Sequence, residues 1–378
     1  MSSQHAAESS VSVPDSGSPT GIWSQVTGTF IVSDTGVLEA GVWQGATEPT
    51  SNWYMNQGQL NAEQLYRSAV LLLRADVDAT EVEALAVSLY PDAGWLGPGR
   101  LRLHGSIELR GPFTLPRPLG IEYGLPATAT SAFEIVVKPD RGAALDPQAP
   151  IVDDLSAAFA DGMPQGEELL ALRSTLSIAQ RLAGSVAVRG ESAPAVVITP
   201  DPDALVNLQI YAPAWISEAE LTDALRPLLP GLARPQLPSP SAFDPAPFMG
   251  EEASPALIRQ ARAETAAYQE YMSGIGSQTF GYQLRAAAGH SSHVVVALAP
   301  TQMAPQALRF ELWASRPMAL YTVVWQPQFY DQAFARRLSR VMRVERLRVT
   351  TVIEQVAAVI ARLSGGIAID DAGFIVSL

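Results

Sequence analysis

Apolar residues near the C-terminal end of the sequence recur at spacings of three and four. Over 349–363 this spacing places them on one side of a helix, so the sequence predicts an amphipathic helix there. Gly365 follows, and glycine readily adopts the left-handed backbone conformation that ends helices. Two short apolar segments, 367–369 and 374–378, flank a turn and predict a hairpin. The predicted unit is therefore a helix, a glycine stop and a hairpin.

The same unit occurs again in the middle of the chain, at 178–188. An alignment without gaps pairs Arg181 with Arg362, Leu182 with Leu363, Gly184 with Gly365, Val186 with Ile367 and Val188 with Ile369. The segment 196–198 supplies the second strand of this hairpin. A weaker third instance at 27–38 has the hairpin pattern but no preceding helix. The recurrence indicates a duplicated architecture.

Each half also contains an apolar strand followed by a capped helix. The strand 70–73 precedes Asp78 and Glu81, and the strand 206–211 precedes Ser217 and Glu220. In such a capping box the first side chain accepts a hydrogen bond from an early backbone amide, and the glutamate reaches back to the cap. Both segments align without a gap as far as a proline, which is a second reason to expect duplication.

The repeated order predicts an α+β fold. We expect a tandem duplication of a ferredoxin-like β-α-β-β-α-β unit, with antiparallel sheets that carry helices on one face. The two repeats should pair as an intramolecular pseudo-dimer. The predicted organisation is a disordered leader over 1–20, an aromatic-rich hairpin region over 21–66 packed on the first domain, a first repeat over 67–200 and a second repeat over 201–378. The second repeat includes a proline-rich linker and an extra helix, together spanning 233–276.

Proline positions and alternation predict further segments. Four prolines between 112 and 126 predict a long irregular loop in the first repeat. Its flanks, 100–109 and 133–137, alternate with period two and predict antiparallel strands. The second repeat should contain a meander of four strands at 281–287, 294–299, 308–313 and 320–325.

Composition narrows the possible functions of the 378-residue chain. The absence of cysteine excludes disulfides and thiolate zinc sites. Lys138 is the only lysine and precedes Pro139, which excludes a phosphate-binding loop ending in Gly-Lys-Ser/Thr. A net charge of −13 argues against general nucleic-acid binding. No apolar run reaches the roughly 18 to 20 residues that cross a bilayer, so we expect no membrane span and a cytoplasmic location.

Arginines are concentrated in the segment that follows Gln332. Six of them, interleaved with apolar residues, predict an amphipathic basic helix over 336–348. Arg336, Arg340 and Arg343 would lie on one face of it. This face could bind an acidic protein partner, a nucleotide, RNA or a small anion. Alternatively, it is a solvated surface that pairs with acidic residues of the same chain.

Other candidate residues give weaker signals. His290 and His293 lie in a predicted turn and could share a metal ion, although a third ligand is missing. Asp153, Asp154, Asp370 and Asp371, with Arg181 or Arg362, could form an enzyme site or a small-anion site in a cleft between the repeats. Without a nucleophile and base, a metal cluster or a phosphate loop, we expect no cofactor. The favoured interpretation is a non-enzymatic binding or accessory protein, chaperone-like or immunity-like.

Overall fold

The computed structural model describes residues 53–144, 154–159, 161–188, 195–235, 254–278, 281–289, 292–333, 335 and 338–378, with side chains of the helix 255–278 only as far as residue 266. Three strands nearer the N-terminus are described by their backbone. The chain divides into two compact units, Met1–Trp53 and Tyr54–Leu378. Both contain antiparallel sheets, and the larger unit adds helices to two sheets, so the fold is α+β.

The smaller unit contains a three-stranded antiparallel sheet. Its strands are β1 (Ala7–Ser10), β2 (Thr27–Val32) and β3 (Leu38–Ala40), in the order β1-β2-β3. The pairing of β2 with β3 confirms the hairpin expected at 27–38. Strand β1 falls within 1–20, where the sequence predicts no regular structure. The other residues of that segment lie outside the described residues.

The first sheet of the larger unit has seven described strands in the order β10-β9-β4-β8-β7-β6-β5. Its elements are α1 (Ala62–Arg67), β4 (Ala69–Arg74), α2 (Ala79–Leu89), β5 (Gly94–Gly97), β6 (Arg100–His104), β7 (Ile107–Thr114), α3 (Arg117–Glu122), β8 (Ala129–Val136), α4 (Asp154–Ala158), α5 (Gly166–Arg181), β9 (Ser185–Val188) and β10 (Val196–Ile198). Helix α2 begins with the predicted capping box, in which Asp78 accepts from the amides of Thr80 and Glu81.

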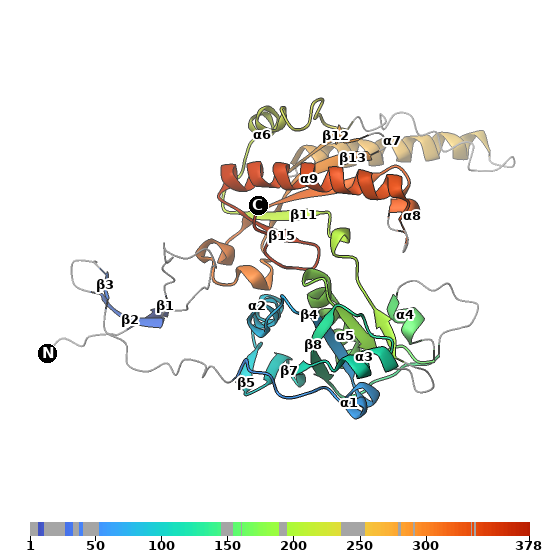
Figure 1. The fold of residues 1–378 in the computed structure, drawn as a ribbon. Coiled ribbons are helices and arrows are strands. Elements are labelled where there is room, and N and C mark those ends of the chain that lie inside the picture. Colours follow the sequence, from blue (N-terminus) through green and yellow to red (C-terminus); the bar gives the residue numbers. More distant parts are fainter. Residues whose placement is uncertain are drawn as a thin grey trace. The chain divides into compact units, whose positions relative to one another are not determined.

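The second sheet has five described strands in the order β12-β13-β14-β11-β15. Its elements are β11 (Leu208–Ala212), α6 (Glu218–Leu225), α7 (Pro255–Gln278), β12 (Tyr282–Ala287), β13 (Ser292–Thr301), β14 (Met318–Pro327), α8 (Tyr330–Ala333), α9 (Arg340–Ser364) and β15 (Ile367–Asp370). Ser217 caps α6 by accepting from the amide of Glu220. Helix α7 confirms the predicted extra helix, and 236–250 of the linker lie outside the described residues. Figure 1 shows α9 extended along the strands of this sheet.

The two sheets share a strand order. In each, the first strand lies between the strand that follows the long helix and the strand that precedes it, giving β9-β4-β8-β7 in one sheet and β15-β11-β14-β13 in the other. Every pair is antiparallel. The equivalent pairs are Leu71 with Val186 and Phe133 in the first sheet, and Ile210 with Ala368 and Tyr321 in the second. Phe133 and Tyr321 are thus both central, and both are fully buried.

Equivalent positions in the two sheets differ by one residue from the sequence alignment. A Cβ on Gly184 would lie 2.6 Å from a carbonyl oxygen of β4, and one on Gly366 would lie 2.7 Å from a carbonyl oxygen of β11. The left-handed residue comes one position earlier, at Ala183 (φ 48°) and at Gly365 (φ 65°). The predicted pairing of Gly184 with Gly365 is therefore wrong by one residue. The close backbone approach occurs at Gly184 and Gly366, and the positive φ occurs one residue earlier in each half.

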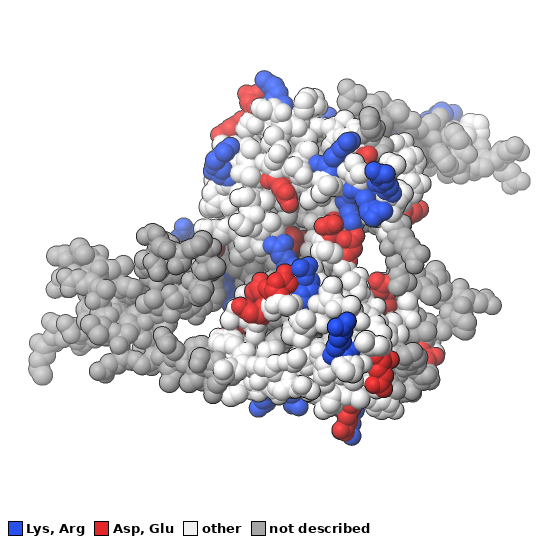
Figure 2. Space-filling view, viewed as in Figure 1, with Lys and Arg blue, Asp and Glu red and all other residues white. Residues whose placement is uncertain are grey.

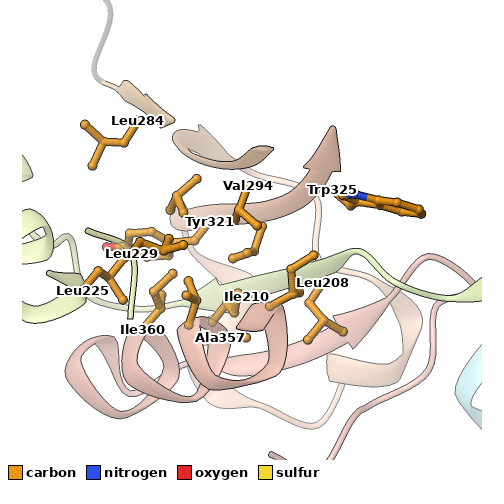
Figure 3. Close-up of a cluster of buried hydrophobic side chains, with 14 of the residues drawn as sticks. Leu208, Ile210, Leu225, Leu229, Leu284, Val294, Tyr321, Trp325, Ala357 and Ile360 are labelled. Carbon is orange, nitrogen blue, oxygen red and sulfur yellow. The ribbon is translucent and has the colours of Figure 1, made fainter. Parts of the chain in front are cut away.

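Each sheet buries one face under its long helix. The apolar cluster around Phe133 joins the first sheet to α2 and α5, and the cluster around Tyr321 joins the second sheet to α6 and α9. Figure 3 shows Leu208, Ile210 and Tyr321 of the second sheet beside Ala357 and Ile360 of α9. On the other face of the first sheet, residues of α1 and of the α3 region cover Val70 and Leu72.

Several predicted segments differ from the structure. The segment 374–378 forms no strand, and an isolated bridge joins its Ile375 to Ile369 of β15. The segment 308–313 does not pair as a strand and instead forms parts of two 3-10 turns, Gln306–Leu308 and Leu312–Ser315, which cover part of the second sheet. Between 109 and 133 the chain is more regular than predicted, because β7 continues to Thr114 through a bulge that accommodates Pro112. Helix α3 follows, with Pro116 at its N-cap and Pro118 in its first turn.

Candidate functional site

The basic segment is interrupted by a helix start. Ser339 has an extended backbone (φ −62°, ψ 158°), and its hydroxyl accepts a hydrogen bond from the amide of Met342 at 3.2 Å. Helix α9 therefore begins at Arg340, and the prediction of one continuous helix over 336–348 is wrong. Arg336 lies outside the described residues, so its alignment with Arg340 and Arg343 remains a prediction.

The first turns of α9 carry apolar residues on two opposite faces. Met342 and Val349 are buried in the core of the second sheet. The opposite side is exposed to solvent, and we call it the outer face; its residues are Arg340, Val341, Arg343, Val344, Leu347 and Arg348. Val341 is 75% and Leu347 is 68% exposed, whereas an ordinary surface helix presents polar side chains there. The sheet therefore gives no reason for the apolar residues of the outer face.

The outer face lies almost wholly on a part of α9 that α5 does not have. Helix α5 has 16 residues and α9 has 25. The offset of 182 from Gly184 to Gly366 places Gly166, the first residue of α5, opposite Arg348. Residues 340–347 thus form an extension of about two turns. Met342 of this extension packs on the second sheet, whereas the outer-face residues of the extension are exposed.

Two aromatic residues enlarge the apolar area near the outer face. Phe329 is 50% exposed, and Tyr330, the first residue of α8, is 67% exposed. Helix α8 packs against α9, which places these rings near the start of the longer helix. Aromatic side chains and arginines are enriched at the energetic centres of protein interfaces.

The charge of the outer face opposes the preference of a helix start. The backbone dipole makes a helix N-terminus partly positive, so each arginine near it costs about 0.3 to 1 kcal/mol relative to a favourable anion. The first turn of α9 has no acidic residue. Within the described part of the chain, neither Arg340 nor Arg343 has an ion-pair partner. Figure 2 shows basic side chains gathered over this end of α9.

Arg346, in the same run, has a structural contact instead. Its side chain is only 7% exposed, and Nη2 lies 2.5 Å from Oδ2 of Asp201. Asp201 is the first residue of the predicted second repeat, so this pair lies within that repeat, next to its junction with the first. The hypothesis that the arginines pair within the chain therefore holds for Arg346, whereas Arg340 and Arg343 belong to the exposed outer face.

The histidines form no metal site among the residues that the structure describes. His293 is half-buried on β13 and lines a depression with Arg285 and Gln326. No group of three or more potential ligands gathers in the described ranges. His290 lies outside them.

Asp370 and Asp371 stabilise the last hairpin turn. Asp370 Oδ1 accepts from the amides of Ala372 at 3.0 Å and Phe374 at 2.9 Å, and Oδ2 lies 3.7 Å from Nη1 of Arg181. Burial raises the pKa of Asp370 more than the other influences lower it. Phe374 enters the apolar core of the first sheet, so the turn connects the two halves.

Asp371 lies in the same turn, whereas the remaining acidic and basic candidates are separate from it. Burial also raises the pKa of Asp371, whose Oδ2 accepts from Asn207 at 3.0 Å. Asp154 is the first residue of α4, and Asp153 lies outside the described residues. Arg362 is exposed near the end of α9, and no ion pair joins it to Asp370 in the described part of the chain. The hairpin carboxylates thus brace the turn between the halves.

Sequence reasoning missed a histidine and aspartate pair at the edge of the first sheet. His104 Nδ1 lies 2.8 Å from Oδ1 of Asp92, whose Oδ2 accepts from the amide of Gly105 at 2.8 Å. The bond with His104 is the largest of the influences that lower the pKa of Asp92. The ring of Tyr90 stacks on His104 with a centroid separation of 4.7 Å. These residues are not adjacent in sequence, and only the turn after β6 brings them together.

A pocket in the first sheet was also missed. It is lined by β4, the ends of β8 and β9, Phe159 and helix α5, and it contains Arg67, Arg141 and Glu168. The sequence feature that could best have indicated this pocket is Glu168 in the first turn of α5. Glutamate is common in first turns, however, because it stabilises the helix.

Comparisons with known proteins add no assignment. No family model, curated protein or solved structure matches the chain. Among the described residues, no helix is both long and apolar enough to span a membrane. The function must therefore be argued from the geometry of the residues themselves.

Proposed function

We propose that the protein is a non-enzymatic cytoplasmic binding or accessory protein, of a chaperone-like or immunity-like kind, that engages an acidic protein partner through the outer face of α9. The observation that carries this proposal is the exposure of Val341, Val344 and Leu347 between arginines on the helical extension. The extension combines apolar area with uncompensated positive charge. A partner with acidic side chains around an apolar ridge would complement both properties.

The mixture of side chains favours a protein over a small anion. A small anion needs a few converging donors, whereas the outer face spreads Arg340 and Arg348 about two turns apart, around aliphatic side chains. Phe329 and Tyr330 extend the same kind of surface. Desolvation of these groups by a partner would supply affinity, and the arginines would supply orientation and salt dependence.

We also propose that the two halves are copies of one ferredoxin-like unit that pair as a pseudo-dimer. The shared strand order and the equivalent central residues Phe133 and Tyr321 support this. A contact between the halves supports it too, because Arg181 of the first half donates to the backbone of the last hairpin. A crystal structure in which β4, β8, β9 and α5 fail to superpose on β11, β14, β15 and α9 would contradict it.

Charge reversal tests the partner proposal. The tagged full-length chain and its Arg340→Glu/Arg343→Glu variant are used to capture proteins from cytosol of the source cells at low and moderate salt, with quantitative mass spectrometry. We expect one acidic protein, stoichiometric with the wild-type chain, to fall by at least about tenfold in the variant, since rim and core charges each contribute on this scale. The same protein should dissociate as salt rises.

The matched control is Arg173→Glu/Arg362→Glu, which makes the same charge change at exposed positions of α5 and the far end of α9. It should retain the partner. A Leu347→Ser variant should lose it, whereas Leu363→Ser, at another exposed leucine of α9, should not. Equal recovery by the two double variants would remove the outer face from consideration.

A further inference from the structure

The pocket in the first sheet has both apolar and basic residues in its lining. It has a volume of about 80 Å³ and opens beside the first residues of β4. Phe159, Leu172 and Val188 supply apolar walls, and Arg67 and Arg141 stand among the polar lining residues. This pocket lies within one half of the molecule and is separate from the outer face of α9.

Among the described residues that line the pocket, Glu168 is the acidic one, and its carboxylate already has hydrogen-bond donors. Glu168 is 6% exposed, with Oε1 2.5 Å from Nη2 of Arg141 and Oε2 accepting from the amide of Asp140 at 2.9 Å. Both oxygens therefore have strong donors, and the carboxylate offers little to a cation. A buried carboxylate held in this way serves to fix the guanidinium of Arg141.

Arg141 keeps unused hydrogen-bonding capacity. Its guanidinium lies 4.2 Å above the ring of Phe159, which holds it flat, and its side chain is 38% exposed. A guanidinium carries five N–H donors, and within the described residues one of its nitrogens, Nη2, has an acceptor. A planar, pre-oriented donor of this kind suits a carboxylate. Arg67 also lines the pocket, but its Nη2 lies 2.8 Å from Oε1 of Glu63, so its charge is already paired and Arg141 is the donor that carries the argument.

The volume limits the size of the occupant. The space is roughly half of the 150 Å³ that holds a benzene ring in an apolar cavity. It accommodates a tail of about three or four carbon atoms. We propose that this pocket binds a short-chain aliphatic carboxylate, with its tail on Leu172 and Val188 and its carboxylate on Arg141.

Binding can be followed at the pocket walls. Methyl NMR spectra of the full-length chain, with assigned Leu172 and Val188, are recorded during titration with acetate, propionate, butyrate and octanoate at constant ionic strength. We expect saturable shifts at both methyl groups, with affinity rising from acetate to butyrate by about threefold to fourfold per added CH₂. Octanoate should bind no better than butyrate, because its tail exceeds the space. Butan-1-ol and butylamine serve as uncharged and cationic probes and should not saturate the site.

Variants separate the pocket from non-specific effects. Arg141→Gln alone would leave Glu168 without its cation, so the double variant Arg141→Gln/Glu168→Gln is used, and it should weaken butyrate binding by at least about tenfold. Arg74→Gln, at an exposed arginine on the same strand as the pocket, should not change it. Absence of saturable carboxylate binding, equal binding of butylamine, or unchanged binding in the double variant would each overturn the proposal. Because none of these residues lies on the outer face of α9, failure here leaves the proposed function intact.

Discussion

Helices α5 and α9 cover equivalent faces of their sheets but begin with opposite charges. The first turn of α5 carries Glu167 and Glu168, as the helix dipole favours, and α9 begins with Arg340 and Arg343. Glu168 is tied to Arg141 and to a backbone amide. The first turn of α5 therefore makes contacts within its own domain, whereas the first turn of α9 remains exposed.

The start of α9 departs from the preference of helix N-termini for acidic residues. The difference indicates a reason that lies outside the helix. Sequences tend to agree with the fold at every level except where function requires otherwise. The unfavourable charge and the exposed aliphatic residues coincide on the extension at 340–347 that α5 lacks. This coincidence is why we propose a partner surface there rather than at other exposed arginines.

The equivalence of the two sheets can be tested most strongly at their central aromatic residues. Phe133→Ala and Tyr321→Ala each remove a fully buried side chain, and each should lower the free energy of unfolding by about 3 to 5 kcal/mol. Denaturation in urea measures the change. Ile121→Ala, at a side chain that is 74% exposed, is the control and should stay within about 0.5 kcal/mol. A small cost at either aromatic residue would contradict the equivalence.

The next largest effect is a difference in stability between variants of Arg346 and Arg343, which lie one helical turn apart. Arg346→Gln removes the nearly buried partner of Asp201 and should destabilise the protein by about 1 to 3 kcal/mol, since buried groups lose a charge-assisted bond. Arg343→Gln should leave stability within about 0.5 kcal/mol, because Arg343 is exposed. Urea denaturation of the two variants gives both values. Equal costs would mean that the run of arginines acts as one structural element.

A smaller change in stability is expected when the charges in the first turns of α9 and α5 are reversed. Arg340→Glu/Arg343→Glu should raise the free energy of unfolding by about 0.5 to 2 kcal/mol while partner binding is lost, because acidic residues suit the helix N-terminus. Glu167→Arg in α5 should lower it by about 1 kcal/mol, through the dipole and loss of the bond from Ser106. Thermal and urea denaturation compare them. If the α9 variant were destabilised, lost binding would be attributed to damage of the helix.

The smallest expected effect is the pH dependence at the turn between the halves. Burial raises the pKa of Asp370 in the folded state, so the unfolded chain ionises first as pH rises and stability falls through the interval above the unfolded pKa of about 3.9. Asp370→Asn should therefore be more stable than wild type near pH 7, with the difference vanishing below about pH 4. Urea denaturation from pH 4 to 8 checks this.

Asp92 provides a comparison of opposite sign. The bond with His104 lowers the pKa of Asp92, so its contribution is present above the unfolded pKa and is lost as pH falls through the lower folded value. Asp92→Asn should accordingly reduce stability near neutral pH, while Asp370→Asn increases it. The same sign for both variants would show that burial does not dominate at Asp370.

Some features followed from the sequence because their causes are local. The cap of α2 at Asp78 and the left-handed Gly365 at the end of α9 depend on neighbouring residues alone. The long amphipathic part of α9 followed from its apolar period. These signals also indicated that two halves of the chain share an order of elements.

Other features were decided only where distant segments meet. If two strands are aligned one residue out of step, every side chain is assigned to the wrong face of the sheet. The pairing of β9 with β4 and of β15 with β11 makes Val186 equivalent to Ala368 rather than to Ile367. Helical spacing already places Arg346 with Met342 and Val349 and apart from Arg343. Only the structure shows that Asp201, 145 positions away in the chain, pairs with Arg346. The pocket at Arg141 likewise exists only because three strand ends and α5 converge. Periodicity determined the elements, and packing determined which side chains remain available to bind.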